Sequence, residues 1–184
     1  MKYLDKVIRN WRTQVSGRYV RERDSVLDIG CFDGYLFRKF EQKKLTNCIG
    51  VDPLLDEDIH TENYQLLKGN FPDALPADKK FDTITMLVVL EHIPRSQQNN
   101  LSEEFYGRLN DKGRVIITVP SPAVDKILDV LMTLKLIDGM SLDEHFGFHP
   151  NEVIDLFQED QFTLLSREKF QFGLNNLFVF EKVS

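Results

Sequence analysis

Residues 25–34 hold the side chains best suited to chemistry, because a short apolar run ends there in a carboxylate and two glycines follow it. The carboxylate belongs to Asp28, and the glycines are Gly30 and Gly34. A run of Val, Leu and Ile is typical of a buried parallel strand, and ligands of open α/β sheets bind where such strands end. The spacing therefore predicts a ligand on the turn between Gly30 and Gly34.

Further residues of interest end or follow the next three strand-like runs. Asp52 lies 24 residues beyond Asp28, close to the ~20-residue offset at which an acid ending a second strand accepts hydrogen bonds from ribose hydroxyls. Because parallel strands end at one edge of a sheet, we expect these residues to meet there. They are Asp52 and Pro53 after 47–51, Asn70 and Phe71 after 64–68, and Leu87 at the end of 81–87.

The elements that must position these residues alternate along the chain. Strand-like runs separated by helical patterns predict βαβ units, a mostly parallel sheet and helices on both of its faces. Two runs near the C-terminus are close enough to pair as an antiparallel hairpin. The seven runs are 25–29, 47–51, 64–68, 81–87, 114–119, 162–170 and 176–183.

Apolar residues at helical spacing predict the helices of a single domain over 1–184. We expect an N-terminal helix within 1–22, a ligand-binding half at 25–120, a lid or substrate segment at 121–149, and a helix and hairpin at 150–184. The expected buried residues are Leu4, Val7, Ile8, Trp11 and Val15 in the first helix, Leu36, Phe37 and Phe40 after Gly34, Leu101, Phe105 and Leu109 later, and Val153, Ile154, Leu156 and Phe157 after Pro150.

Composition narrows the class of protein. The 184 residues carry a formal net charge of −6, which argues against a large phosphate-binding surface and hence against nucleic acid as a substrate. No apolar stretch approaches the roughly 20 residues of a membrane span, and the N-terminus lacks the apolar region of a signal peptide, so we expect a cytoplasmic protein. Two cysteines are too few for a disulfide framework.

Taken in order, these motifs resemble those of the class I S-adenosylmethionine-dependent methyltransferases over about residues 25–120. The resemblance implies a Rossmann-like three-layer α/β/α sandwich with a mostly parallel seven-stranded sheet and an antiparallel C-terminal hairpin strand. Further similar stretches are Phe81-Asp82, 90–93 and 109–113. The implied cofactor is S-adenosylmethionine, with S-adenosylhomocysteine as product, and the implied cofactor-binding residues are Asp28, Gly30, Cys31, Phe32, Gly34, Asp52, Pro53, Asn70, Phe71 and Leu87.

The chemistry of these residues suits that cofactor. Asp28 offers a charge opposite to an ammonium beside a sulfonium, whereas it would repel a pyrophosphate. Asp52 can accept hydrogen bonds from both ribose hydroxyls, Asn70 can bond an adenine edge, and Phe71 or Pro53 can form an apolar wall. In the family, the backbone of the residue at Leu87 meets the ammonium. Phe32 replaces the family's usual middle glycine, so its ring must turn away from the cofactor or lie along it.

The resemblance implies in-line displacement at the sulfonium methyl, for which a base is optional. Candidate bases are His92, His145 and His149. His92 has a structural alternative at the start of a helix, and His149 has one as the cap before Pro150. Segment 143–149 combines acids, histidines and aromatics and is predicted to form part of the substrate pocket, whereas the apolar helix at 123–137 is predicted to form a lid or a homodimer interface. Gly147 and Pro150 disfavour a zinc site, and we expect no metal.

A small-molecule methyltransferase is therefore the leading hypothesis. A nucleic-acid methyltransferase is disfavoured, because 87–90 lacks the Asn/Asp-Pro-Pro-aromatic motif of amino-directed enzymes. A nicotinamide-dependent oxidoreductase is disfavoured because Gly30 and Gly34 do not complete the Gly-x-Gly-x-x-Gly fingerprint. A non-catalytic cofactor-binding or scaffold subunit stays open, and no residue selects the methyl acceptor.

Overall fold

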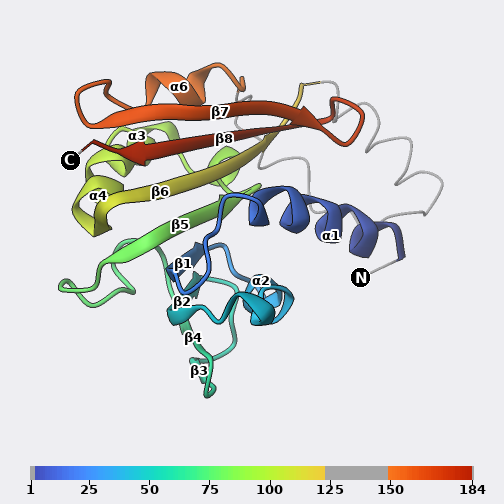
Figure 1. The fold of residues 1–184 in the computed structure, drawn as a ribbon, viewed down its shortest axis with the longest axis vertical. Coiled ribbons are helices and arrows are strands. Elements are labelled where there is room, and N and C mark those ends of the chain that lie inside the picture. The colour runs from blue at the N-terminus through green and yellow to red at the C-terminus, as the bar shows by residue number, and fades with distance from the viewer. Residues whose placement is uncertain (1–2, 123–148, 184) are drawn as a thin grey trace.

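The computed structural model describes residues 3–122 and 149–183, and its centre is a mixed sheet of eight strands. The strands lie in the order β3-β4-β2-β1-β5-β6-β8-β7 (Figure 1). Their bounds are β1 Ser25–Ile29, β2 Thr46–Asp52, β3 Ile59–His60, β4 Tyr64–Lys68, β5 Phe81–Leu87, β6 Leu109–Pro120, β7 Phe162–Phe170 and β8 Asn175–Lys182.

The pairing directions confirm the predicted Rossmann-like sheet. Strands β4, β2, β1, β5 and β6 are parallel to one another, so their C-terminal ends share one edge. Strand β8 runs antiparallel between β6 and β7, which is the predicted C-terminal hairpin. All seven predicted strands are present. The eighth, β3, pairs antiparallel with β4 through two exposed residues, which is too short a run to show periodicity.

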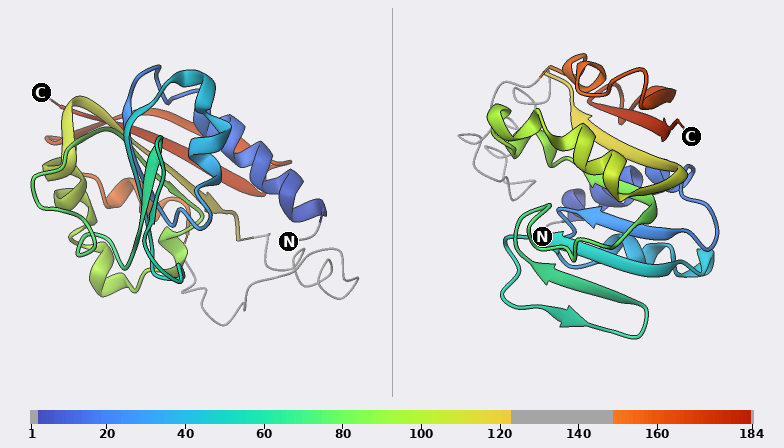
Figure 2. Two further views of the ribbon diagram at one scale, coloured as in Figure 1. Left: turned by 90° about the horizontal axis from the view of Figure 1, so that it is seen from below. Right: turned by 90° about the vertical axis from the view of Figure 1, so that its left-hand side faces the viewer.

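Helices lie on both faces of the sheet, as predicted (Figure 2). One face packs in a cluster with Leu36 and Phe37 of α2 and is also covered by α1, and the other face packs with Phe105 of α4 and Val153 of α6. The bounds are α1 Tyr3–Gly17, α2 Tyr35–Lys39, α3 Arg95–Gln98, α4 Leu101–Arg108 and α6 Glu152–Asp155, with short 3-10 helices η1 Glu41–Lys43 and η2 Leu90–His92.

The N-terminal helix α1 buries a different side from the one that its apolar stripe predicts. Val7 and Trp11 stay 39% and 37% exposed, while Thr13, Ser16 and Gly17 are buried. Small residues allow close approach: a Cβ on Gly17 would lie 2.5 Å from the Phe40 ring. The prediction was therefore wrong for Val7 and Trp11, because α1 meets the domain through its small residues.

The segment after Pro150 forms a shorter helix than its pattern suggests. Helix α6 covers four residues, and Val153 and Phe157 are buried as predicted. Residues 123–148 lie outside the described part of the chain, and with them the predicted lid or dimer helix at 123–137. Within the described residues, no helix has the length and apolar character needed to span a membrane.

Candidate active site

The turn after β1 requires glycine at its first position. Gly30 has φ +75°, and a Cβ there would lie 2.3 Å from Cγ2 of Val89. The backbone N–H groups of Gly30 and Cys31 both donate to the carbonyl of Val51, at 2.9 and 3.3 Å. Gly34, with φ +69°, closes the turn by donating to the carbonyl of Cys31 at 2.9 Å. The turn is therefore held against the end of β2, and its backbone has no room for side chains at Gly30.

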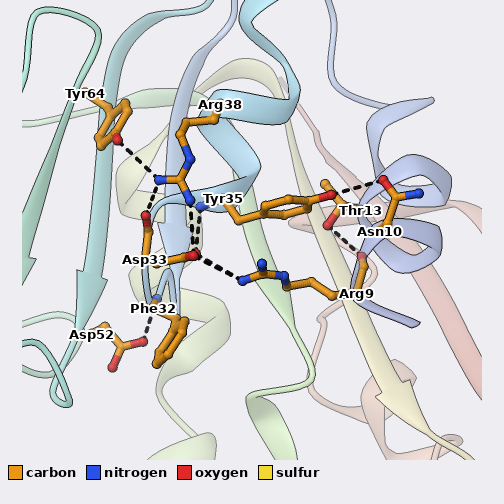
Figure 3. A network of polar contacts seen from close by, with 9 residues as sticks. All are labelled: Arg9, Asn10, Thr13, Phe32, Asp33, Tyr35, Arg38, Asp52 and Tyr64. Carbon is orange, nitrogen blue, oxygen red and sulfur yellow. Dashed lines mark hydrogen bonds and ion pairs between the residues drawn. The ribbon is translucent and has the colours of Figure 1, made fainter. Parts of the chain in front are cut away.

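Phe32 turns its ring outward. It has φ +48° and is 55% exposed, and this left-handed conformation is uncommon for a bulky residue. Its backbone N–H donates to Oδ2 of Asp52 at 2.8 Å, and Figure 3 shows the ring lying apart from the polar groups around Asp33. The residue that departs from the family pattern thus contributes its amide to the site and keeps its side chain in solvent.

Asp52, at the end of β2, is held by two backbone amides. Besides the Phe32 contact, its Oδ1 accepts from the N–H of Leu54 at 2.9 Å, and only 6% of the residue is exposed. A carboxylate has about four lone-pair sites, so each oxygen keeps a further one for a ligand hydroxyl. The Asp52 carbonyl also accepts from Gly69 N–H at 3.2 Å, which ties the turn before Asn70 to the same edge.

Asp28 makes the interior of the turn a place for a positive charge. Its Oδ1 accepts from the hydroxyl of Thr85 at 2.7 Å, and 5% of the residue is exposed. The pKa of Asp28 is raised to about 7, chiefly by burial; the hydrogen bond from Thr85 opposes the rise, and the charges of Asp52 and Asp33 add to it. A cation bound beside Asp28 would relieve this cost. Burial, followed by the charge of Asp28, also raises the pKa of the Cys31 thiol, which is therefore inert.

The end of β5 is strained and is contacted by α1. Val88 has φ +62°, which is an outlier for a β-branched residue, and its N–H donates to the carbonyl of Thr118 at 2.9 Å. The carbonyl of Leu87 accepts from Nη1 of Arg12 at 3.4 Å. Such strain is found at functional sites, and it lies here at the backbone that the resemblance assigns to the cofactor.

A buried acid, Glu91, and a half-buried cation, Arg12, flank this end of β5. Glu91 is 2% exposed, and neither of its carboxylate oxygens has a hydrogen-bond partner among the described residues. Burial raises the pKa of Glu91 to about 7, and the charge of Arg12 opposes that rise. Burial also lowers the pKa of Arg12, and Glu91 opposes it. The sequence analysis included Glu91 only within the stretch 90–93 and gave neither residue a role, because the two are far apart in the chain.

Helix α1 is fastened to the turn through Asp33 (Figure 3). The Asp33 carboxylate pairs with Arg9 at 3.2 Å and with Arg38 at 3.1 Å, and it accepts from the N–H of Tyr35 at 3.1 Å. The Arg9 guanidinium also stacks 4.1 Å from the centre of the Tyr35 ring. The sequence analysis missed this network, because Arg9 lies 24 residues before Asp33 in the chain.

The residues expected around an adenine ring lie at the same edge. Pro53 and Asn70 are exposed, and the Asn70 carbonyl accepts from Ala74 N–H at 2.9 Å. The Phe71 ring packs 5.5 Å from the Phe105 ring, so one side of it belongs to the core. Leu54, beside Asp52, is 71% exposed and is an apolar surface that the sequence analysis did not identify.

The two described candidate histidines have structural contacts. His92 ends η2, and its N–H donates to the carbonyl of Val89 at 2.9 Å. His149 accepts the N–H of Asn151 on Nδ1 at 3.3 Å and the N–H of Glu152 on its carbonyl at 2.9 Å, which matches its alternative role as a cap. His145 lies outside the described residues. No group of three or more His, Cys, Asp or Glu residues within 3–122 and 149–183 is placed to hold a metal ion.

Comparisons with known proteins agree with this geometry. The family model described as "Methyltransferase domain" matches residues 2–175. No curated protein sequence matches the chain.

Solved structures of similar fold share little sequence with the chain. A chain of the Haloferax volcanii complex that contains the Trm112 methyltransferase activator has 16% identity and a TM-score of 0.72, with 96% of this chain and 91% of that one covered. Magnesium protoporphyrin IX methyltransferase from Synechocystis, solved with S-adenosylhomocysteine, has 14% identity and a TM-score of 0.63, with 99% and 88% covered. The N-methyltransferase NodS of Bradyrhizobium japonicum has 14% identity and a TM-score of 0.60, with 98% and 97% covered.

Proposed function

Because the chain belongs to the methyltransferase domain family and is an S-adenosylmethionine-dependent methyltransferase, we propose that it methylates a small molecule by in-line displacement. The observation that supports the cofactor site best is Asp52, held by the amides of Phe32 and Leu54 beside the Gly30 turn. An amide-held carboxylate there is ready to accept the two ribose hydroxyls at little cost in side-chain entropy.

Each remaining part of the cofactor has a chemically suited residue at this edge. Asp28 and the carbonyl of Leu87 end neighbouring paired strands, and together they suit the ammonium. The exposed amide of Asn70 suits the adenine edge, and Pro53 or Phe71 suits its apolar face. Gly30, Cys31 and Gly34 allow the backbone to approach closely.

When bound, S-adenosylmethionine supplies an electrophilic methyl group. The protein's contribution is to align that methyl with the acceptor and to exclude water, because charge is dispersed as the new bond forms. A base is needed only where the acceptor must lose a proton. His92 and His145 stay candidates for that base. The cap contacts of His149 favour a positioning role for it.

Two observations favour a small acceptor. The net charge of −6 disfavours a long phosphate backbone. Two relatives of the same fold, by their names, act as a magnesium protoporphyrin IX methyltransferase and an N-methyltransferase. The match of the methyltransferase domain to residues 2–175 disfavours the alternative of a non-catalytic subunit. The cytoplasmic location and a homodimer through 123–137 remain predictions.

Calorimetric titration with S-adenosylhomocysteine tests the proposal. The parent protein should bind it, and Asp52→Asn should weaken binding by about 10- to 100-fold, since each hydrogen bond to a charged group contributes about 1.5–3 kcal/mol. Glu57→Gln removes one exposed acid from the loop after β2 and is the matched control, expected to bind like the parent. Absence of binding by the parent would refute the proposed function.

A further inference from the structure

A hollow of about 430 Å³ opens where β6, β7 and β8 meet. Val119 of β6 and Lys169 of β7 both pair with Asn176 of β8, so the ends of these three strands lie side by side. We call it the Arg167 hollow; the lining residues that matter here are Ser121, His149, Asn151, Arg167, Lys169 and Asn176. The volume falls in the range of small-molecule sites, about 300–1,000 Å³.

The charge of the Arg167 hollow is opposite to that of the whole chain. Arg167 and Lys169 line it, and none of the described lining residues is acidic, although the chain has a net charge of −6. Neither cation forms an ion pair with a described residue. Glu168, between them, points to the other face and pairs with Arg18 at 2.7 Å. Two cations without acids favour an anion as their partner.

The Arg167 guanidinium is held in place by neutral groups. One of its nitrogens donates to Oδ1 of Asn151, and its plane lies over the Phe178 ring, 5.3 Å from the ring centre. Glu152, which follows Asn151, is ion-paired with Arg95 at 2.6 Å and so is engaged elsewhere. A guanidinium has five N–H donors, and its fork matches carboxylate and phosphate oxygens.

Partly buried hydrogen bonds fix the floor of the hollow. Nδ2 of Asn176, a residue that is 2% exposed, donates to Oγ of Ser121 at 2.9 Å, and that hydroxyl donates to the carbonyl of Gly173 at 2.7 Å. These bonds join the end of β6 to the turn between β7 and β8. The cations therefore project from a rigid base, which is what a binding site needs.

The Arg167 hollow lies at the same edge of the sheet as the cofactor turn. Leu87, at the end of β5, pairs with Thr118 of β6, two residues before β6 ends at Pro120. Pro122 and His149, which flank residues 123–148 in the chain, both line the hollow. An acceptor held there would therefore lie at the edge where the methyl group is delivered.

We propose that the Arg167 hollow binds an anionic group of the methyl acceptor, a carboxylate or a phosphate, through Arg167 and Lys169. This inference rests on the proposed function and adds a substrate class to it. Asn151 positions the guanidinium, and Asn176 with Ser121 supports the floor. The acceptor is accordingly a small acid, and the reacting atom lies on the part of it nearer to Leu87.

Amide spectra of the full-length ¹⁵N-labelled protein, recorded at low ionic strength with S-adenosylhomocysteine present, test this directly. Inorganic phosphate and benzoate are titrated separately, with benzamide as the neutral counterpart of benzoate. At least one of the two anions should shift the amide signals of Gly173 and Asn176, and which one does so distinguishes phosphate from carboxylate. Replacing both cations, Arg167→Gln with Lys169→Gln, should weaken that binding about tenfold or more.

Arg18→Gln is the control, since it also removes one positive charge near β7 but on the opposite face. It should leave anion binding within about twofold of the parent, since Arg18 does not line the hollow and its charge is paired with Glu168. Equal shifts with benzamide, no shift with either anion, or equal weakening by Arg18→Gln would each overturn the inference. Binding of S-adenosylhomocysteine is measured on the same samples, so its retention in such a case leaves the proposed function standing.

Discussion

The turn after β1 and the Arg167 hollow lie at one edge of the sheet, yet different chemical groups form their surfaces. At the turn, buried carboxylates and backbone amides make the surface, as in the contact of Asp52 with the N–H of Phe32. In the hollow, exposed cations on long side chains do so, with Arg167 held by Asn151. One region is negative and shaped by the backbone, and the other is positive and shaped by side chains.

This difference teaches where the specificity of such a protein lies. A turn whose contacts are made by the main chain tolerates almost no change, because moving it breaks several hydrogen bonds together. A hollow formed by surface side chains can change its ligand by single substitutions that leave the fold intact. We therefore expect substitutions at the turn to abolish cofactor binding and those in the hollow to alter acceptor choice.

The largest effect should follow Gly30→Ala, which changes the turn after β1. The added Cβ would lie 2.3 Å from Val89, and the residue would keep φ +75°. Left-handed strain of about 1–2 kcal/mol and overpacking of about 1–3 kcal/mol should lower affinity for S-adenosylhomocysteine about 30-fold or more by calorimetry. Gly107→Ala, where the added Cβ meets nothing within 4 Å, is the control. Parent-like affinity in Gly30→Ala would show that the turn does not hold the cofactor.

A strong pH dependence should also separate the two regions. Because burial raises the pKa of Asp28 to about 7, this carboxyl group is protonated below that pH. An ammonium ligand that binds there must displace the proton. Affinity for S-adenosylhomocysteine should fall by roughly tenfold per pH unit below 7, with proton release visible in buffers of different ionisation enthalpy. Asp28→Asn should remove this pH dependence.

The stability of the ligand-free protein should change with pH in the opposite direction to its affinity for S-adenosylhomocysteine. The raised pKa gives the ligand-free protein stability that is complete below the unfolded pKa of Asp28 and is lost as the pH rises through about 7. Asp28→Asn should therefore make the ligand-free protein more stable than the parent at pH 8, measured by urea unfolding. An Asp28→Asn protein that is no more stable at pH 8 would mean that burial does not disfavour the charge of Asp28.

An intermediate effect is expected from Arg12→Met, which removes the positive charge that opposes the raised pKa of Glu91. Removing the guanidinium should raise the pKa of Glu91 above its present value of about 7. The stability that the protonated form provides is lost as the pH rises through that pKa. Arg12→Met should therefore lower the free energy of unfolding, measured in urea, by about 1–3 kcal/mol more at pH 8 than at pH 5.5. Adding Glu91→Gln should remove the pH dependence, and a penalty equal at both pH values would contradict the coupling.

The sequence predicted the turn well because its signals are local. Gly30, Gly34 and Asp28 lie within seven positions of one another, and the central strands are buried on both faces, so their apolar runs are continuous. The contacts of Arg12 with β5 and of Asn151 with Arg167 join distant segments, and no spacing within the chain encodes them. Tertiary packing alone decides such contacts.

The error in α1 has the same origin. A hydrophobic pattern states which side chains gain from burial, but not which neighbour is available. Helix α1 meets Phe40 through Gly17, whose missing side chain permits the approach, and Trp11 is left to pair edge-on with the exposed ring of Phe172, 5.5 Å away. A small buried residue gives no signal in an apolar count, so the packing side was assigned wrongly.

The smallest effect should come from His149→Ala, at the rim of the Arg167 hollow. Its Nδ1 accepts the N–H of Asn151, and Asn151 in turn holds the Arg167 guanidinium. Loss of a cap typically costs about 0.5–2 kcal/mol, so urea unfolding should show a decrease near the lower end of that range. Benzoate or phosphate affinity should fall about two- to threefold, because Arg167 becomes less well positioned, whereas His149→Asn, which can cap, should restore both. A loss of methyl transfer in His149→Asn with anion affinity intact would instead place His149 at the reacting atoms.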